Sequence, residues 1–507
     1  MPAQSGRARL FRNLLLTATA VFLLLRFVHL TADYPGNIRW DDGIATDEGW
    51  YASSAVNAQT WGQALLPGDM NIPVLMPVWP AIASLAFKLG GFHVGTLRAT
   101  AVLFFILCLA LGCVLLRRYG AKEWVPLFAA LLAINPWAFA FSRAGFLEFP
   151  TVALCLLAMV AGVDRRPEQE RLSSTLRLTR LLVGGVIFAL AVLLKSIAVV
   201  LAPVVLYMVL EAHRFRVRRA VRDAVLFFGA AGLVYAPYWW LRIRPHQTDV
   251  NFYLSVVKNT LRLTPYGLIA DTSRPFRYGL GSDHILFALS LVVLPVSLLS
   301  RRARVLWRDP LFALAGVWLI SFLGFMVKHN NDPARYFAVT LPAVLMLTMA
   351  MLRNVSWSGP RARGVLLALV AADLCINAAQ ITIAMLHPAY TFHNASMAIG
   401  QIVRSDPAHS QVVIGDDMHE VALGSGLRPV NLLFHSASIT EQMERYQPGW
   451  WLQFSPIEDG RCFRQVLSKA YTAEKRGEWT IFPNKQHLVL WKLDRVGRTD
   501  DPDTARP

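Results

Sequence analysis

Long apolar runs recur along the chain and constrain its fold more than any other feature. A helix needs about 20 apolar residues to cross the hydrocarbon core of a bilayer. With 55% hydrophobic and only 16% charged residues in 507, the chain is too apolar for a soluble or disordered protein of this length. We expect about eleven spans, near Leu14–Leu30, Leu97–Leu116, Trp124–Phe141, Phe146–Val163, Leu181–Leu194, Ile197–Leu210, Val225–Leu241, Ile285–Leu299, Leu311–Val327, Phe337–Leu352 and Val365–Leu386. The sequence therefore predicts a polytopic α-helical membrane protein.

The apolar stretch from Leu181 to Leu210 is too long for one crossing and short for two. We place a break at Lys195-Ser196, because a lysine in the middle of a membrane is costly. At a helix end, the same side chain can extend to the interface.

The basic residues indicate how the spans are oriented. The net charge is +17, which in a soluble protein would point to nucleic acid, but here about 23 Lys and Arg lie in short loops on the amino-terminal side of the spans. Short cytoplasmic loops carry this excess in membrane proteins. The pattern predicts a cytoplasmic amino terminus, and an odd number of spans places the carboxy terminus outside. Nucleic-acid binding is excluded on the same ground.

Three long segments then face the exterior: residues 31–96, residues 242–284 and the tail after His387. The first holds two short helical patterns, Glu48–Trp61 and Pro73–Leu89, which suit helices lying in the interface plane. The tail has the composition of a soluble α/β domain. We therefore divide the chain into a transmembrane module, 1–386, and an extracytoplasmic domain, 387–507. Strands are expected at Gln411–Ile414, Pro429–Phe434, Trp450–Phe454, Trp479–Phe482 and His487–Leu493, with helices at Thr440–Tyr446 and Arg464–Arg476.

Two adjacent carboxylates, Asp47 and Glu48, open the first of these outer helical patterns. Neighbours on a helix point about 100° apart, so one can face a cavity while the other caps the helix or holds a cation. A carboxylate at this position could take a proton from a hydroxyl as a general base. The alternative is a simple amino-terminal cap, because acidic residues are favoured in the first helical turn.

Further charged residues lie at outer helix ends. Arg143 and Glu148 flank the turn between the third and fourth spans, and either serve function or form an ion pair that closes the hairpin. Basic residues at outer helix ends are unexpected, because Lys and Arg otherwise gather in the predicted cytoplasmic loops. They could bind an anionic phosphate, or each could instead extend to lipid headgroups. These basic residues are Lys195, Lys328-His329 and Arg335, which Tyr336 follows. In the tail, Asp416-Asp417 with His419 could bind a metal but is more often a turn, and no catalytic role is assigned there.

These motifs resemble the GT-C superfamily of polytopic glycosyltransferases, which take sugars from polyprenyl-phosphate carriers. The resemblance covers approximately Leu14 to Leu352, and within the superfamily the chain is similar to the bacterial PMT/ArnT-like group, including the RgtA/B/C/D-like enzymes. It rests on the Asp-Glu pair, the Pro-rich segment after it, Arg-x4-Glu at the next outer turn, Lys195, and the Arg-Tyr pair. Two departures are a missing lysine in Ile72–Pro77 and Ser196 in place of the commoner glycine.

The resemblance implies a role for each matched position. Asp47 falls on the catalytic aspartate and Glu48 on its companion, while Glu148, with Arg143 beside it, falls on the acidic residue of the second outer turn. Lys195, Arg335 and Tyr336 fall on the residues that face the donor phosphate, and we add Lys328 and His329 to that set. No cofactor is required, because a monophosphate donor does not need a metal; Mg²⁺ or Mn²⁺ at Asp47, Glu48 or Glu148 stays open.

The expected function is transfer of a hexosyl or pentosyl group from a polyprenyl-phosphate sugar to an acceptor hydroxyl on the outer face of a bacterial inner membrane. The configuration is expected to invert, with Asp47 as base, and the sequence leaves open whether the acceptor is a glycan, a glycolipid or a protein. One alternative is a transporter or flippase of a lipid-linked anion, although no two-fold internal repeat supports it. A second is a non-catalytic scaffold for envelope assembly.

Overall fold

The structure, a computed structural model, describes residues 6–35, 47–69, 71–165, 173–251, 276, 280–281, 285–301, 303–327, 334–354, 360–432, 437–455, 470–481 and 486–496. All structural statements below concern these residues.

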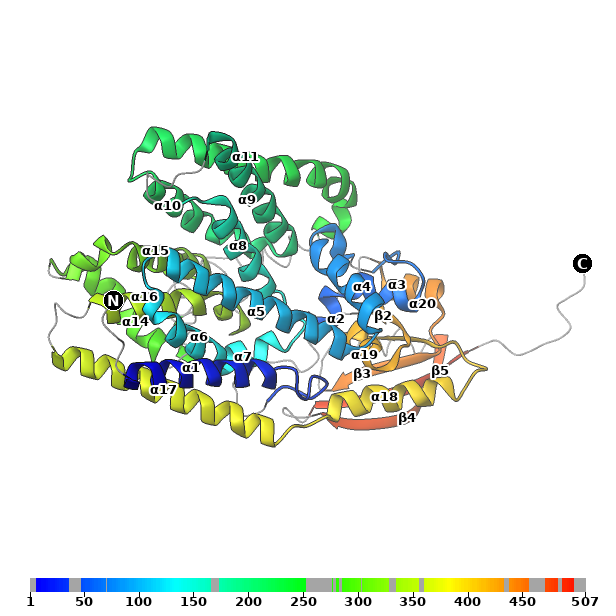
Figure 1. The fold of residues 1–507 in the computed structure, drawn as a ribbon. Helices are drawn as coiled ribbons and strands as arrows, with labels where there is room; N and C mark the ends of the chain where they lie inside the picture. The colour runs from blue at the N-terminus through cyan, green and yellow to red at the C-terminus, as the bar shows by residue number, and fades with distance from the viewer. Residues whose placement is uncertain are drawn as a thin grey trace, which may run out of the picture.

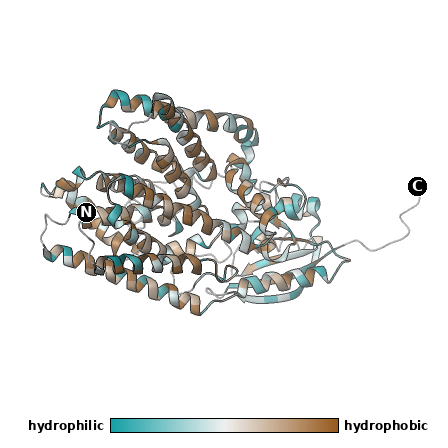
Figure 2. Cartoon of the chain, viewed as in Figure 1, coloured by the Kyte–Doolittle hydropathy of each residue, from teal (hydrophilic) through white to brown (hydrophobic). Residues whose placement is uncertain are grey.

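A bundle of long apolar helices forms the first part of the molecule, and a small mixed domain lies at one end of it (Figure 1). The bundle helices are α1 (Gly6–Leu25), α5 (Val94–Arg118), α6 (Val125–Ile134), α7 (Pro136–Ser142), α8 (Glu148–Gly162), α9 (Ser174–Leu194), α10 (Ala202–Ala212), α11 (Val217–Tyr238), α14 (Leu286–Leu299), α15 (Pro310–Met326), α16 (Leu341–Asn354) and α17 (Pro360–Leu386). Helix α8 packs between α5 and α9, and α15 packs on α16. Apolar residues dominate this bundle, while polar residues gather in the small domain and at helix ends (Figure 2).

The apolar helices confirm a multi-pass membrane protein. Six helices in the described part are long and apolar enough to cross a bilayer, and the bent pair α6–α7 raises the number to seven. Four other predicted spans correspond to shorter apolar helices, namely α8, α14, α15 and the segment 196–212. The figure of eleven spans therefore stays a prediction.

Two features of the bundle have clear local causes: a break that the sequence predicts, and a bend within the predicted span Trp124–Phe141 that it does not. Helix α9 ends at Leu194, Lys195 is extended, and a 3-10 helix, η4 (Ser196–Leu201), follows, which confirms the predicted break. Helices α6 and α7 meet at 63°, because Pro136 cannot continue the hydrogen bonding of α6 and Asn135 caps α7 instead.

The small domain contains one five-stranded sheet. Its strands are β1 (Val412–Gly415), β2 (Arg428–Asn431), β3 (Trp450–Ser455), β4 (Tyr471–Ile481) and β5 (Gln486–Arg495), in the order β2-β1-β3-β5-β4. Strand β1 is parallel to β2 and β3, and β5 is antiparallel to β3 and β4. Its helices are α18 (Thr391–Arg404), α19 (Met418–Ser425) and α20 (Ile439–Tyr446). The predicted α/β domain is thus present.

One predicted element of that domain is wrong. We expected a helix at Arg464–Arg476, but residues 471–476 begin the edge strand β4, and 464–469 lie outside the described residues. The charged side chains Glu474, Lys475 and Arg476 resemble a solvated helix face, yet here they are exposed on a strand whose backbone pairs with β5. Charged side chains on an edge strand are common, since they discourage pairing with other chains.

The first outer segment lies between the bundle and the small domain (Figure 1). It forms α2 (Asp47–Tyr51), α3 (Ser53–Thr60), the 3-10 helix η1 (Ile72–Val74) and α4 (Val78–Gly90), which agrees with the two predicted helical patterns. Its contacts with the small domain include a hydrogen bond from Trp61 Nε1 to the Pro429 carbonyl at 3.0 Å and one from Gln442 Nε2 to the Gly68 carbonyl at 3.3 Å.

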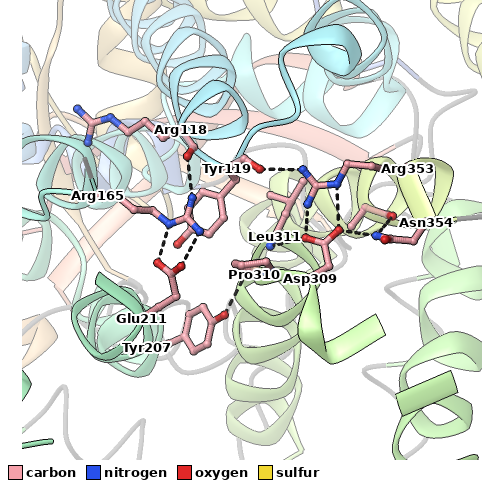
Figure 3. A network of polar contacts seen from close by, with 11 residues as sticks. Arg118, Tyr119, Arg165, Tyr207, Glu211, Asp309, Pro310, Leu311, Arg353 and Asn354 are labelled. Carbon is pink, nitrogen blue, oxygen red and sulfur yellow. Dashed lines mark hydrogen bonds and ion pairs between the residues drawn. The ribbon is translucent and has the colours of Figure 1, made fainter. Parts of the chain in front are cut away.

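The other ends of the helices meet in a separate polar network (Figure 3). Arg165 forms a bidentate pair with Glu211, with nitrogen-oxygen distances of 2.5 and 2.6 Å, and donates to the Arg118 carbonyl at 2.7 Å. Arg353 donates to the Tyr119 carbonyl at 2.7 Å and pairs with Asp309. These residues come from five loops or helix ends predicted to share one face of the membrane. Their meeting supports the predicted alternation of the helices.

Candidate active site

Four charged side chains that the sequence singles out converge at the end of the bundle that faces the small domain. Lys195 Nζ donates to Glu148 Oε1 at 2.6 Å, and Arg335 Nε lies 3.5 Å from the same oxygen. A second nitrogen of Arg335 forms an ion pair with Asp47. Two acids and two bases from distant parts of the chain therefore form one continuous cluster.

Each member is held by a helix end. Asp47 begins α2 and Glu148 begins α8, Lys195 lies at the break between α9 and η4, and Arg335 lies in the 3-10 helix η8 (Ala334–Thr340). Acidic residues in a first helical turn are stabilised by the helix dipole. The starts of α2 and α8, the end of α9 and the 3-10 helix η8 thus lie close together and bring the four charged residues to the same end of the bundle.

Two tyrosines complete the surroundings of the lysine. Lys195 Nζ donates to the Tyr51 hydroxyl at 3.2 Å and lies 4.3 Å from the centre of the Tyr336 ring. Tyr336 is a predicted site residue, whereas Tyr51, which is buried, has no role predicted from the sequence. Its position four residues after Asp47, on the same helical face, is the signal that could have identified it.

The acids of the cluster differ in accessibility. The side chains of Glu148 and Lys195 are 1% and 6% exposed, while that of Asp47 is 26% exposed. Asp47 is therefore the more accessible carboxylate of this cluster.

Glu48, the neighbour of Asp47, is not part of this cluster, because other residues donate hydrogen bonds to both of its carboxylate oxygens. Its two carboxylate oxygens accept from Arg98 Nε at 2.9 Å and Nη2 at 2.7 Å, from the Gly145 N–H at 2.7 Å, and from the Tyr34 hydroxyl. Its side chain is 1% exposed. With every oxygen engaged, Glu48 fastens α2 to the bundle, and it is not placed to exchange protons with a substrate. Arg98 was not predicted, although its position at the start of an apolar run is a signal of function or pairing.

Arg143 and the pair Lys328-His329 do not add to the cluster. Arg143 donates to the backbone carbonyls of Val28 and His29 after α1, the latter at 2.9 Å, whereas Glu148 pairs with Lys195 and Arg335. The predicted Arg143–Glu148 partnership is therefore not the arrangement found. Lys328 and His329 lie outside the described residues.

The cluster offers few ligands to a divalent cation. A hard cation such as Mg²⁺ needs several oxygen ligands. Arg335 engages Asp47, and Lys195 engages Glu148 Oε1, while Glu148 Oε2 is buried without a hydrogen-bond partner in the part of the chain that the structure describes. The described residues hold no group of three metal-ligating side chains.

The small domain brings two further acids close to α2. Glu420 of α19 accepts from the Gly49 N–H at 2.5 Å, and burial together with the nearby charge of Glu48 raises its pKa well above the ordinary range. Burial and the charge of Asp47 likewise raise the pKa of Asp417, which precedes α19 in the left-handed conformation at φ 50°. The sequence singles out the adjacent acids Asp416 and Asp417, but the pattern is interpreted there as a turn.

Comparison with known proteins shows a partial family match and two similar folds. A family model described as dolichyl-phosphate-mannose-protein mannosyltransferase matches residues 61–246, a range that includes Glu148 and Lys195 but not Asp47. The fold is similar to ArnT from Cupriavidus metallidurans, solved bound to undecaprenyl phosphate, with a TM-score of 0.61 and 14% identity over 94% of this chain and 98% of that one. It is also similar to the Archaeoglobus fulgidus oligosaccharyltransferase, solved with zinc and sulfate, with a TM-score of 0.51 and 13% identity over 93% of this chain and 72% of that one. No curated protein sequence matches the chain significantly.

Fold and site together define a multi-pass membrane protein of GT-C architecture with a small α/β domain at one end. The predicted resemblance is confirmed: residues 61–246 match the PMT family model, and the fold is similar to that of ArnT.

Proposed function

We propose that the protein transfers a sugar from a polyprenyl-phosphate donor to an acceptor hydroxyl on the outer face of a bacterial inner membrane, with inversion at the anomeric carbon. The observation that carries the proposal is the buried cluster of Asp47, Glu148, Lys195 and Arg335. It combines one accessible carboxylate with two cations, which is the set that this reaction needs. The similarity to a structure bound to undecaprenyl phosphate supports the choice of donor.

Lys195 and Arg335 are assigned to the donor phosphate. Lysine provides a compact positive charge and arginine a planar fork, and both bind phosphate oxygens through charge-assisted hydrogen bonds. Cations fixed before the reaction stabilise the negative charge that develops as the lipid phosphate leaves. Tyr51 and Tyr336 hold the lysine in place from two sides.

Asp47 is assigned as the general base. Its carboxylate takes the proton of the acceptor hydroxyl, the acceptor oxygen forms a bond to the anomeric carbon, and the bond from that carbon to the phosphate oxygen breaks. The polyprenyl phosphate leaves with the bonding electrons, so a single displacement inverts the configuration. One positioned base typically contributes 10²–10⁴-fold to the rate.

The test of the base is Asp47→Asn. Membranes that contain the natural donor and acceptor pools should lose the product, seen in their glycan and glycolipid profile, while the purified variant still binds undecaprenyl phosphate. Glu441→Gln is a matched control, since it changes an exposed acid of α20 that pairs only with a neighbouring arginine. Product formation at the normal rate in the Asp47 variant would reject the assignment.

A further inference from the structure

The small domain contacts the helix that carries the proposed base. Helix α19 packs against α2, and Glu420 Oε2 accepts from the Gly49 N–H at 2.5 Å. Gly49 follows Asp47 by two residues, in the first turn of a helix of only five residues. An N–H in the first turn has no partner within its own helix, so Glu420 supplies the acceptor that α2 lacks.

The approach of the two helices is close enough to depend on a glycine. A Cβ atom at position 49 would lie 2.3 Å from the backbone nitrogen of Glu420 and 2.5 Å from the carbonyl carbon of His419. Such contacts are with backbone atoms, which cannot move aside as a flexible side chain can. The glycine therefore lets α19 reach the backbone of α2.

Helix α19 is itself firmly held. It follows β1 and is packed against α18 and β2, and its residues Met418 and Val421 belong to the core of the small domain. A second contact, from His419 to the Asn57 side chain at 3.0 Å, fixes the same helix to α3. Glu420 thus lies on a firmly packed helix, α19, and contacts the short helix α2.

On the far side, Glu48 fastens α2 to the bundle through Arg98. Asp47 lies on the same short helix as these two attachments, and it reaches Arg335 only while α2 keeps its position. Displacing a reacting group by about 1 Å can lower a rate 10²-fold.

We propose that Glu420 is a positioning residue for Asp47, so that the small domain is an integral part of the catalytic site. The inference rests on the proposed function, in which Asp47 is the base. The small domain then does more than cover the membrane module: it sets the orientation of the helix on which the base stands.

The chemical state of Glu420 decides the design of the test. Glu48, Arg98 and Asp417 act on Glu420, and burial and the Glu48 charge raise its pKa well above the ordinary range. A carboxyl group and a carboxamide have similar shape, and both offer an oxygen to the Gly49 N–H. Glu420→Gln should therefore keep the contact, whereas Glu420→Ala removes it.

The experiment compares two quantities in the full-length protein. The first is the initial rate of product formation in membranes with the natural donor and acceptor pools, and the second is the dissociation constant of undecaprenyl phosphate for the purified variants. We expect Glu420→Ala to lower the rate about 10- to 100-fold and to leave the dissociation constant within twofold. Glu420→Gln should retain at least a third of the rate. Trp61→Phe is the matched control, because it removes one hydrogen bond to the same domain without touching α2, and its rate should be unchanged.

Three outcomes overturn the inference while the proposed function stands. They are a normal rate in Glu420→Ala when Asp47→Asn is inactive, an equal loss in Trp61→Phe, and a parallel loss of lipid binding in Glu420→Ala. Activity in Asp47→Asn overturns the proposed function instead. If Glu420→Ala does not accumulate in membranes, Glu420→Asp replaces it, because the shorter side chain withdraws the oxygen from Gly49, and the same separation of rate from binding is expected.

Discussion

Glu48→Gln separates a structural carboxylate from a catalytic one. The sequence predicts that Glu48 is the companion of the base, but in the structure four donors from three partners occupy its oxygens. An amide at this position keeps one acceptor and turns an NH₂ group toward Arg98. The guanidinium of Arg98, whose side chain is 8% exposed, then stays buried without its counter-charge.

The expected cost follows from that burial. Removing one partner of a buried ion pair costs about 3–5 kcal/mol, and the amide replaces only part of what is lost. Asp47→Asn, in contrast, changes a side chain that is 26% exposed, and Arg335 keeps Glu148 nearby, so we expect a cost of about 1 kcal/mol or less. Thermal unfolding of the two purified variants in the same detergent measures the difference.

The result that refutes this reasoning is specific. If Glu48→Gln unfolds at the same temperature as Asp47→Asn and is equally inactive, then Glu48 acts in the reaction and its contacts with Arg98 are not what stabilises α2. A lower unfolding temperature, with lipid binding and activity retained in the folded fraction, supports the structural role.

Two further predictions concern opposite ends of the bundle. Lys195→Gln and Arg335→Gln should each weaken binding of undecaprenyl phosphate about 10- to 100-fold, because a charge-assisted hydrogen bond contributes about 1.5–3 kcal/mol. Titration of the purified variants with the lipid measures this change. An affinity equal to that of the unmodified protein would mean that both residues only form structural ion pairs. Asp309→Asn should lower the unfolding temperature without changing lipid affinity, because Asp309 pairs with Arg353 in the network of Figure 3, at the other helix ends. A change in affinity in that variant would show that the two ends are coupled.

Local sequence patterns singled out the charged residues that the structure brings together. The cost of charge inside apolar runs identified Glu148 and Lys195, and the break at Lys195 followed from the same argument. Their mutual pairing did not follow, because it joins residues 47 positions apart whose side chains meet only when the helices pack. The resemblance to GT-C enzymes supplied the roles, and no pattern distinguished the function of Asp47 from that of Glu48.

Contacts between domains were beyond prediction for a physical reason. Glu420 contacts Gly49 across 371 positions of sequence, and the approach is encoded by the absence of a side chain at one glycine. A glycine after two acids reads equally well as a flexible turn. The strand β4 failed similarly: its charged residues fit a helix locally, and only pairing with β5 decides its conformation.

In the proposed mechanism, the pairing of Asp47 with Arg335 links donor binding to release of the base. In the structure the two acids and the two bases of the cluster pair with one another, so a phosphate that binds Arg335 would have to compete with Asp47. Binding of the phosphate to Arg335 would then free the Asp47 carboxylate to accept the proton of the acceptor.

This competition has a measurable sign. Asp47→Asn removes the competing charge, so the inactive variant should bind undecaprenyl phosphate more tightly than the unmodified protein, whereas Glu441→Gln should bind it equally well. The gain should shrink with rising salt, since it is electrostatic, although partial burial limits the screening. Weaker binding in Asp47→Asn would mean that the Asp47 carboxylate helps to hold the donor. Asp47 would then act on the sugar or its phosphate, and the proposal that phosphate binding frees it to act as the base would be wrong.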